Sequence, residues 1–474
     1  MASENWIEDS DLSNTERFIQ WFGGDLRYMV GRGWHFWNGE IWQPDAEAVA
    51  IECAKDTAVL MLRQINEIED EKKRKAAIKW AKQSQSISKL RAIVSLAESD
   101  NRMRLPQAHF NRDPWALNCA NGTINLKNGK LTDHERLDYC TRMSPAKYGA
   151  ALEEDSLWLT FLREVTGGDK ELEGYLQRVA GYCLTGSIAE KCFFFCYGGG
   201  DNGKSVFIEV LHALTGDYSL ALSTETLAKK KYGNQGIPND IARLNGPRLA
   251  TVSETGKGQE WNDALIKDLT GGDIITARFL NQEFFDFRPQ CKLIIRGNNK
   301  PEVTDNSSGM WKRIQLIPFE VQISPDKQDK ELREKIVRRE LGGVLQWAVE
   351  GCIQWQIKGL AAPDSITAAG EAYRAEMDIL GEYIKNRLNY NASNPMSESA
   401  SLIYEDYKKW CEGEASDPYS QTKFGREMSA RGYKRVRNRQ GIKYAHTTLQ
   451  PSTQPQGEQS ESDPTLDDDD DFNI

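Results

Sequence analysis

The sequence lacks long apolar runs, paired cysteines and a signal peptide. No apolar run reaches about 18 residues, the length that crosses a bilayer, so we expect no membrane span. The nine cysteines form no Cys-x-x-Cys pair and show no zinc-ligand spacing, so we expect no zinc site. The acidic, polar N-terminus does not resemble a signal peptide. Cys192 and Cys196 lie in an apolar run, which predicts buried thiols of a cytoplasmic protein.

Charge is unevenly distributed along the 474 residues. The formal net charge is −10, but residues 450–474 carry eight acidic side chains and no Lys or Arg, which leaves −2 for the rest. Residues 419–444 carry eight Lys or Arg and one acid, Glu427. The basic segment indicates a module that binds nucleic acid, and the acidic segment after it indicates a disordered tail. The alternatives are a solvated basic face and a docking site for the tail itself.

Hydrophobic patterns and turn residues divide the chain into segments. Aromatic and polar residues alternate around Asn38-Gly39, which predicts a hairpin, and charged amphipathic helices follow. Between residues 191 and 319, buried strands alternate with helices, as in a parallel α/β core. The segments that we expect are an α+β N-terminal region at 1–105, strands with Asn-Gly turns at 106–160, the core at 161–330, a helical segment at 331–394, a small α/β module at 395–449 and the tail at 450–474.

One short stretch carries a specific motif. Gly198 to Ser205 reads Gly-Gly-Gly-Asp-Asn-Gly-Lys-Ser, which fits G-x-x-x-x-G-K-[ST], between an apolar strand and a helix. The backbone N–H groups of such a loop surround a β-phosphate. Lys204 is expected to reach the β- and γ-phosphates and the Ser205 hydroxyl to ligate Mg²⁺. A chance match in a glycine-rich turn is the alternative. The residues expected to bind ATP are Gly198, Gly200, Asp201, Asn202, Gly203, Lys204 and Ser205.

Three further residues fit an ATP-hydrolysis site. Glu254 ends the apolar strand "RLATVSE" and is the candidate acid for the metal and the attacking water, if that strand neighbours the P-loop strand. Asn298 ends the strand "CKLIIRGN" and can orient the water or contact the γ-phosphate, although Asn-Asn-Lys-Pro also suits a turn. Arg313 follows a polar loop and is a candidate arginine finger for a neighbouring subunit. The alternatives are a solvated acid and an ordinary surface arginine.

Taken in order, these motifs resemble the superfamily-three helicases, the AAA+-related motors of small DNA viruses, phages and plasmids. The stretch "LTGGD", a later Ala-Arg and "RGNNKP" narrow the resemblance to the phage/plasmid primase-helicase family, which includes the poxvirus primase-helicase. "DPWALNCANGTINLKNGKL" resembles the domain that precedes the helicase in that family. The resemblance covers residues 20–449 and implies an α/β fold, a P-loop AAA+-like parallel-sheet core followed by a winged helix.

The same resemblance implies a role for each site residue. Lys204 and Ser205 match the Walker A residues, Glu254 the Walker B acid, Asn298 the sensor asparagine and Arg313 the arginine finger. Many relatives end the Walker B strand with two acids, whereas this chain has a serine at position 253. Which acid completes the Mg²⁺ shell therefore stays open.

Residues 274–287 read as a hairpin with its tip near Arg278, Phe279, Leu280 and Asn281. In the family this hairpin grips single-stranded DNA in a central channel. Relatives often have a Lys-His pair at the tip, so Arg278 would here supply the phosphate contact and Phe279 a stacking face. The alternative is an apolar hairpin packed against the core.

The basic module resembles the winged-helix domain of the family, with a helix, a turn at Gly432 and strands around Arg439. Phosphate contacts of such a cluster give affinity with little sequence information. The residues expected to contact DNA are Lys423, Arg426 and Arg431 on the helix and Lys434, Arg435 and Arg437 on the wing.

The resemblance implies a homo-hexameric ATPase that uses Mg²⁺ and unwinds DNA 3′→5′ from single-stranded and forked substrates, in the replication of a phage or mobile element within the host cytoplasm. Residues 1–105 show no convincing Asp-x-Asp pair on a strand, where polymerase metals would bind, so we expect no priming activity. The end "DDDDDFNI" resembles the C-terminal peptides of single-strand-binding proteins, which recruit replication partners, so a primase, a polymerase or a single-strand-binding protein is an expected partner of the tail. Alternatives are an origin-binding initiator that melts or marks DNA without processive unwinding, a nucleotide-regulated transcription factor, and a tail without a partner.

Overall fold

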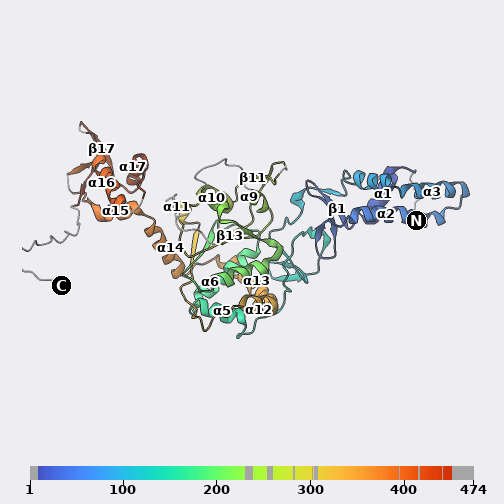
Figure 1. The fold of residues 1–474 in the computed structure, drawn as a ribbon, viewed down its shortest axis with the longest axis horizontal. Helices are drawn as coiled ribbons and strands as arrows, with labels where there is room; N and C mark the ends of the chain where they lie inside the picture. The colour runs from blue at the N-terminus through green and yellow to red at the C-terminus, as the bar shows by residue number, and fades with distance from the viewer. Residues whose placement is uncertain are drawn as a thin grey trace, which may run out of the picture. The chain divides into compact units, whose positions relative to one another are not determined.

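The chain forms two units, Met1–Tyr373 and Arg374–Ile474, which are described separately (Figure 1). Among the described residues, no helix has the length and apolarity needed to cross a bilayer. The computed structural model describes residues 9–229, 239–253, 260–280, 283–301, 303, 308–393, 396–414, 417–439 and 441–450.

The N-terminal part of the first unit is a helical bundle against a small sheet. Four helices and four strands form it: α1 Asp11–Phe22, β1 Leu26–Met29, β2 Gly33–Trp37, β3 Trp42–Pro44, α2 Val49–Gln64, α3 Glu71–Ser84, α4 Ile87–Ala97 and β4 Arg104–Leu105. The strand order is β3-β2-β1-β4. Trp37 pairs with Trp42, and the Asn38 side-chain oxygen accepts hydrogen bonds from the N–H groups of Glu40 (2.9 Å) and Ile41 (2.8 Å), so the predicted hairpin is confirmed.

A second small sheet follows in the next segment. Its strands are β5 Ala116–Cys119, β6 Gly122–Asn125 and β7 Lys130–Thr132, in antiparallel order β5-β6-β7. An Asn-Gly pair lies at each of its two turns, Asn121-Gly122 at the beginning of β6 and Asn128-Gly129 before β7, and both glycines have positive φ. The turns predicted for this segment are therefore confirmed.

A five-stranded, fully parallel sheet forms the core of the first unit. Its strands are β8 Phe193–Tyr197, β9 Ser219–Leu222, β10 Leu249–Ser253, β13 Lys292–Gly297 and β14 Ile314–Pro318, in the order β14-β8-β13-β10-β9. The strands are buried on both faces, which explains why they read as continuous apolar runs. Cys192 and Cys196 are buried within this core, as predicted, and burial raises the pKa of the Cys196 thiol to about 12.

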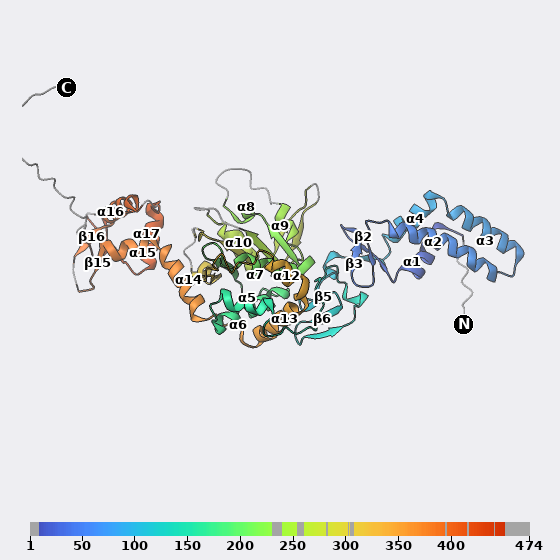
Figure 2. The same ribbon diagram turned by 60° about the horizontal axis from the view of Figure 1, so that its bottom comes forward.

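Helices cover both faces of the sheet (Figure 2). The described helices of this part of the chain are α5 Leu157–Val165, α6 Lys170–Leu184, α7 Lys204–Thr215, α8 Thr224–Leu227, α9 Asn239–Arg243, α10 Asp263–Gly271, α11 Ser308–Trp311, α12 Leu332–Arg339 and α13 Leu341–Lys358. Helices α6 and α13 pack with their backbones nearly touching, because a Cβ on Gly181 or Gly351 would collide with the backbone of the facing helix. A hairpin of β11 Ile275–Ala277 and β12 Phe285–Phe287 lies outside the sheet.

The boundary between the two units falls within α14 Asp364–Glu376, after Tyr373. The elements of the second unit are α15 Ile379–Arg387, β15 Leu388–Tyr390, β16 Ser397–Ser399, α16 Ala400–Gly413, α17 Gln421–Ala430, β17 Arg435–Asn438, β18 Gly441–Ala445 and β19 Thr447–Leu449. The strands form an antiparallel β16-β18-β17 sheet and a β15-β19 pair. Residues 388–390, expected to be helical, are a strand because Leu388 pairs with Leu449 near the end of the module.

Candidate nucleotide-binding site

The predicted phosphate loop lies between β8 and α7. Phe193 to Cys196 are fully buried in the sheet, the chain then turns, and α7 begins at Lys204 as expected. The Gly203 backbone has φ +80°, which favours glycine, and a Cβ there would lie 2.5 Å from Val165 Cγ1 and 2.8 Å from Phe161 Cε2 of α5. The last glycine of the motif is therefore required by backbone conformation and by close packing on α5.

The loop is held to the neighbouring strand β14 by its own asparagine. The Asn202 side-chain amide donates to the carbonyl oxygen of Phe319 (2.7 Å), and the N–H of Phe319 donates to the carbonyl oxygen of Tyr197 (2.7 Å). The N–H of Ile323 also donates to the carbonyl oxygen of Asp201 (2.9 Å). The chain that follows β14 therefore supports the loop at both of its ends.

Lys204 points into the loop. Its ammonium donates to the carbonyl oxygens of Gly198 (2.8 Å) and Gly199 (2.7 Å) and to Asn202 Oδ1 (2.8 Å), and the residue is only 6% exposed. A buried ammonium needs such partners, because an uncompensated charge is costly to bury. These carbonyls hold the cation where a phosphate group would approach the loop.

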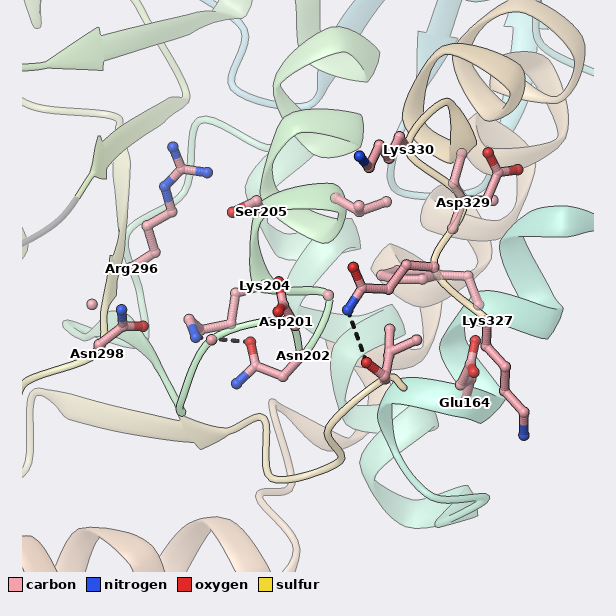
Figure 3. Close-up of a pocket in the computed structure, with 18 residues that line it drawn as sticks. Glu164, Asp201, Asn202, Lys204, Ser205, Arg296, Asn298, Lys327, Asp329 and Lys330 are labelled. Atoms are coloured by element: carbon pink, nitrogen blue, oxygen red, sulfur yellow. Dashed lines mark hydrogen bonds between the residues drawn. The ribbon is translucent and has the colours of Figure 1, made fainter. Parts of the chain in front are cut away.

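A cavity of about 390 Å³ opens above the loop (Figure 3). Gly200, Asp201, Asn202, Gly203, Lys204 and Ser205, all predicted to bind ATP, line it. A Cβ on Gly200 would meet no atom within 4 Å, so the loop leaves open space on this side. Of the seven predicted ATP-binding residues, only Gly198 is outside the lining, because its position faces Asn202 and Phe319 instead.

The strand next to the loop supplies a second wall of the cavity. Asn298 follows β13 directly and lines the cavity, where it was predicted to act. Arg296 lies two residues earlier and lines it as well, although we did not predict it. Alternation along the chain places the two side chains on one face, so an arginine directly after the apolar residues 293–295 was the available signal.

The segment after β14 forms the opposite wall. Figure 3 shows Lys327, Asp329 and Lys330 of this segment across the cavity from Asn298, together with Glu164 of α5. Asp329 pairs with Lys335 (2.7 Å), and this contact holds the pKa of the Asp329 carboxyl below its usual range. Sequence reasoning missed this wall, because a lysine in a charged surface segment carries no pattern of its own.

The remaining predicted acid lies outside the described residues. β10 ends at Ser253, and Glu254 follows it directly. β10 does not neighbour the P-loop strand β8, because β13 lies between them and pairs Arg296 with Ser253, so the condition attached to the prediction for Glu254 is not met. The role of Glu254 stays a prediction.

Arg313 is not among the described residues that line the cavity. It precedes β14, and its carbonyl oxygen accepts a hydrogen bond from the N–H of Phe193, at the beginning of β8. Its guanidinium donates to Thr270 Oγ1 (3.2 Å) and to the carbonyl oxygen of Gly309 (2.7 Å). Arg313 therefore lies at the amino ends of the strands, whereas its own phosphate loop lies at their carboxyl ends.

The predicted hairpin is confirmed as β11 and β12. Arg278 is exposed at its tip, with the guanidinium 4.9 Å from the centre of the Phe284 ring. Phe279 is half-buried, stacks on Phe285 (ring centroids 5.6 Å) and lies under the guanidinium of Arg32, 4.4 Å away. Leu280 is exposed and Asn281 lies outside the described residues.

The predicted basic residues of the second unit differ in their surroundings. Lys434, Arg435 and Arg437 are exposed beside or on β17, and Arg426 is exposed on α17. The ammonium of Lys423, also on α17, lies 3.9 Å from the centre of the Tyr419 ring. Arg431 lies one residue beyond α17 rather than on it, and pairs with Asp378 (2.7 Å). The tail at 451–474 lies outside the described residues.

Two protein families match parts of the chain. A family described as "D5 N terminal like" matches residues 15–167. A family of unknown function (DUF5906) matches residues 196–313, the segment that begins in β8 and ends before β14. The phosphate loop and Asn298 fall within the second match.

Similar proteins are found in large DNA viruses. A protein of Acanthamoeba polyphaga mimivirus named "Putative helicase" is 25% identical over 343 residues, which cover 68% of this chain and 35% of that protein. A "Putative helicase" of Frog virus 3 is 24% identical over 51% of this chain and 26% of its own length. A "Putative primase" of African swine fever virus (isolate Warthog/Namibia/Wart80/1980) is 23% identical over 68% of this chain and 35% of its own length.

The matched part of this chain spans about a third of the length of the viral relatives. Among solved structures, the C-terminal region of NrS-1 aligns with 64% of this chain over 78% of its own length, at 11% sequence identity and a TM-score of 0.39. The D5-like match and the names of the viral relatives, putative helicases and primases, agree with the resemblance to primase-helicases predicted from the motifs.

Proposed function

We propose that the chain is an ATP-dependent DNA helicase that unwinds duplex DNA in the replication of a phage or mobile genetic element. The observation that carries this proposal is one cavity lined by Lys204, Ser205 and Asn298, at the carboxyl ends of two adjacent parallel strands. Ligands of open α/β sheets bind at this edge. The similarity to viral proteins named as helicases and primases supports the same role.

The loop residues fit ATP and Mg²⁺. Open space faces Gly200, the ammonium of Lys204 is aimed at the loop, and Ser205 is exposed on the first turn of α7, where the helix dipole favours an anion. Mg²⁺ is usually held by one or two protein oxygens together with phosphate oxygens, which suits Ser205 and a following acid. The metal would neutralise charge on the phosphates; Lys204 would bind them, and Asn298 would orient the attacking water.

The position of Arg313 favours a ring of identical subunits, a homo-hexamer in this proposal. An arginine at the amino ends of the strands can complete the ATP site of a neighbouring copy while it stays outside the ATP site of its own copy. Such a head-to-tail contact closes into a ring when the rotation allows. The ring would then move 3′→5′ along one DNA strand. Arg278 and Phe279 of each hairpin would contact that strand.

The test is strand separation on a forked DNA substrate with ATP and Mg²⁺. The intact protein should separate the strands, and Lys204→Ala should not, because it removes the cation that binds the β- and γ-phosphates. Thermal unfolding of both proteins controls for folding. A well-folded protein that hydrolyses ATP without separating the fork would contradict the proposal.

An origin-binding initiator is the second candidate. The exposed arginines on and beside the β17–β18 strand pair, Arg435, Arg437 and Arg439, favour it, because they suit duplex binding independent of ATP. Sequence-specific duplex binding that survives Lys204→Ala, without fork separation by the intact protein, would establish this alternative.

A further inference from the structure

Arg296 is an arginine of the cavity that none of the motifs accounts for. It is the fifth residue of β13, opposite Cys196 of β8 on one side and Ser253 of β10 on the other. Its side chain is 26% exposed and lines the cavity together with Asn298. The strand pairing therefore places one cation of this chain between the phosphate loop and the strand that ends at Ser253.

The guanidinium of Arg296 is held by a carboxylate of the phosphate-loop helix. Arg296 Nη1 lies 3.1 Å from Glu209 Oε1, and Glu209 is one helical turn beyond Ser205, on the same side of α7. Figure 3 shows the guanidinium turned along α7, away from Lys204. Arg296 is thus held beside the phosphate position by a partner on the same helix that begins at the loop.

Glu209 has a second cationic partner. Its Oε2 lies 3.5 Å from Arg333 Nε at the beginning of α12, next to the cavity-lining Leu332. Glu209 would therefore keep a counter-ion if Arg296 turned away, and no carboxylate would be left unpaired. The pair of Arg296 and Glu209 is partly exposed, so the interaction is weak and Arg296 can exchange it for another anion.

We propose that Arg296 contacts the terminal phosphate of ATP in its own subunit and discriminates ATP from ADP, with Glu209 as its partner when that phosphate is missing. This inference rests on the proposed ATP site. An arginine binds phosphate in bidentate geometry, and such charge-assisted hydrogen bonds are about twice as strong as neutral ones. Glu209 is a positioning residue, because it acts only by holding Arg296.

The test is equilibrium binding of fluorescent mant-ATP and mant-ADP, each with Mg²⁺, to the full chain and its variants. Arg296→Ala should weaken mant-ATP binding by about tenfold or more and leave mant-ADP binding within about twofold, because only the terminal phosphate loses a partner. Glu209→Gln should raise the preference for mant-ATP. Arg243→Ala is the matched control, since Arg243 pairs with Asp240 (3.2 Å) away from the cavity, and it should change neither affinity.

Equal weakening of both nucleotides by Arg296→Ala, or no change in either, would overturn the inference while leaving the ATP site intact. Failure of the unmodified protein to bind either nucleotide would instead overturn the proposed function. If Arg296→Ala does not fold, Arg296→Lys serves in its place, because it keeps a cation for Glu209 but loses the bidentate contact. Arg296→Lys must then lower the ratio of ATP to ADP affinity, and an unchanged ratio contradicts the inference.

Discussion

Arg313 and Lys204 lie beyond opposite ends of the strands of one parallel sheet, Arg313 at the amino ends and Lys204 at the carboxyl ends. Arg313 precedes β14 and Lys204 follows the loop after β8, and these two strands run parallel from Ile314 and Phe193. β8 is five residues long, so its amino and carboxyl ends are about 16 Å apart at about 3.3 Å per residue. Lys204 and Arg313 of one copy are therefore unsuited to contact the same phosphate group, which is the geometric basis for proposing shared sites.

Replacing Gly203 by alanine should destabilise the first unit. Its backbone has φ +80°, and a Cβ would lie 2.5 Å from Val165 and 2.8 Å from Phe161. Strain of this kind costs about 1–3 kcal/mol, so the midpoint of thermal unfolding should fall. Gly200→Ala is the control, because a Cβ there would meet open space, and it should leave the midpoint unchanged. Equal effects of the two substitutions would contradict the role assigned to α5 packing.

Lys292 should make the stability of the first unit depend on pH. It is buried, and burial lowers the pKa of its ammonium to about 7 from the ordinary 10.5. Its Nζ donates to the carbonyl oxygens of Thr185 and Gln290. Between these pKa values the unfolded chain binds more protons than the folded one, so the free energy of unfolding rises with pH, by up to about 1.4 kcal/mol per unit. Below about pH 7 this contribution is constant.

Urea unfolding of the intact protein and of Lys292→Met at several pH values between 7 and 10 measures this effect. The variant should lose the rise in unfolding free energy, because methionine does not titrate. The other ionisable groups contribute equally to both proteins and cancel in the difference. Parallel pH profiles for the two proteins would show that the Lys292 ammonium keeps its ordinary pKa.

Strand order explains which parts of the site were predictable. The strand–loop–helix around Lys204 is local, so residues 193–215 were enough to predict it. That β13 lies between β8 and β10 depends on pairing between residues far apart in sequence, such as Ile294 with Phe194, and no local pattern encodes it. The segment with Lys330 also lies far from the loop in sequence, and the N–H of Ile323 in this segment donates to the carbonyl oxygen of Asp201 in the loop.

Replacing Arg278 by alanine should weaken binding of single-stranded DNA. The side chain is exposed at the hairpin tip, where it can contact a phosphate. Loss of one such contact should reduce the slope of log affinity against log salt concentration by about 0.7. Arg288→Ala is the control, because its guanidinium donates to the carbonyl oxygen of Gly272 (2.9 Å). An unchanged salt slope for Arg278→Ala would remove the tip from the DNA-binding surface.

Two arginines of the second unit should respond differently to substitution. Arg437 is exposed on β17, so Arg437→Ala should lower DNA affinity and the salt slope without changing stability. Arg431 pairs with Asp378, which also accepts a hydrogen bond from the N–H of Gly381 at the beginning of α15. Arg431→Ala should therefore lower stability, by up to about 1 kcal/mol. Fluorescence anisotropy and thermal unfolding measure the two effects, and a reversed pattern would contradict both assignments.

The shared ATP site is tested most directly by mixing two inactive variants. Lys204→Ala lacks the phosphate-binding cation and Arg313→Ala lacks the candidate finger, and each alone should lose ATPase activity by about 10²-fold or more. In a mixed ring, some sites combine an intact Lys204 with an intact Arg313 from the next copy. The account predicts that ATPase activity partly returns on mixing. Two variants that assemble together and stay inactive at every mixing ratio would contradict it.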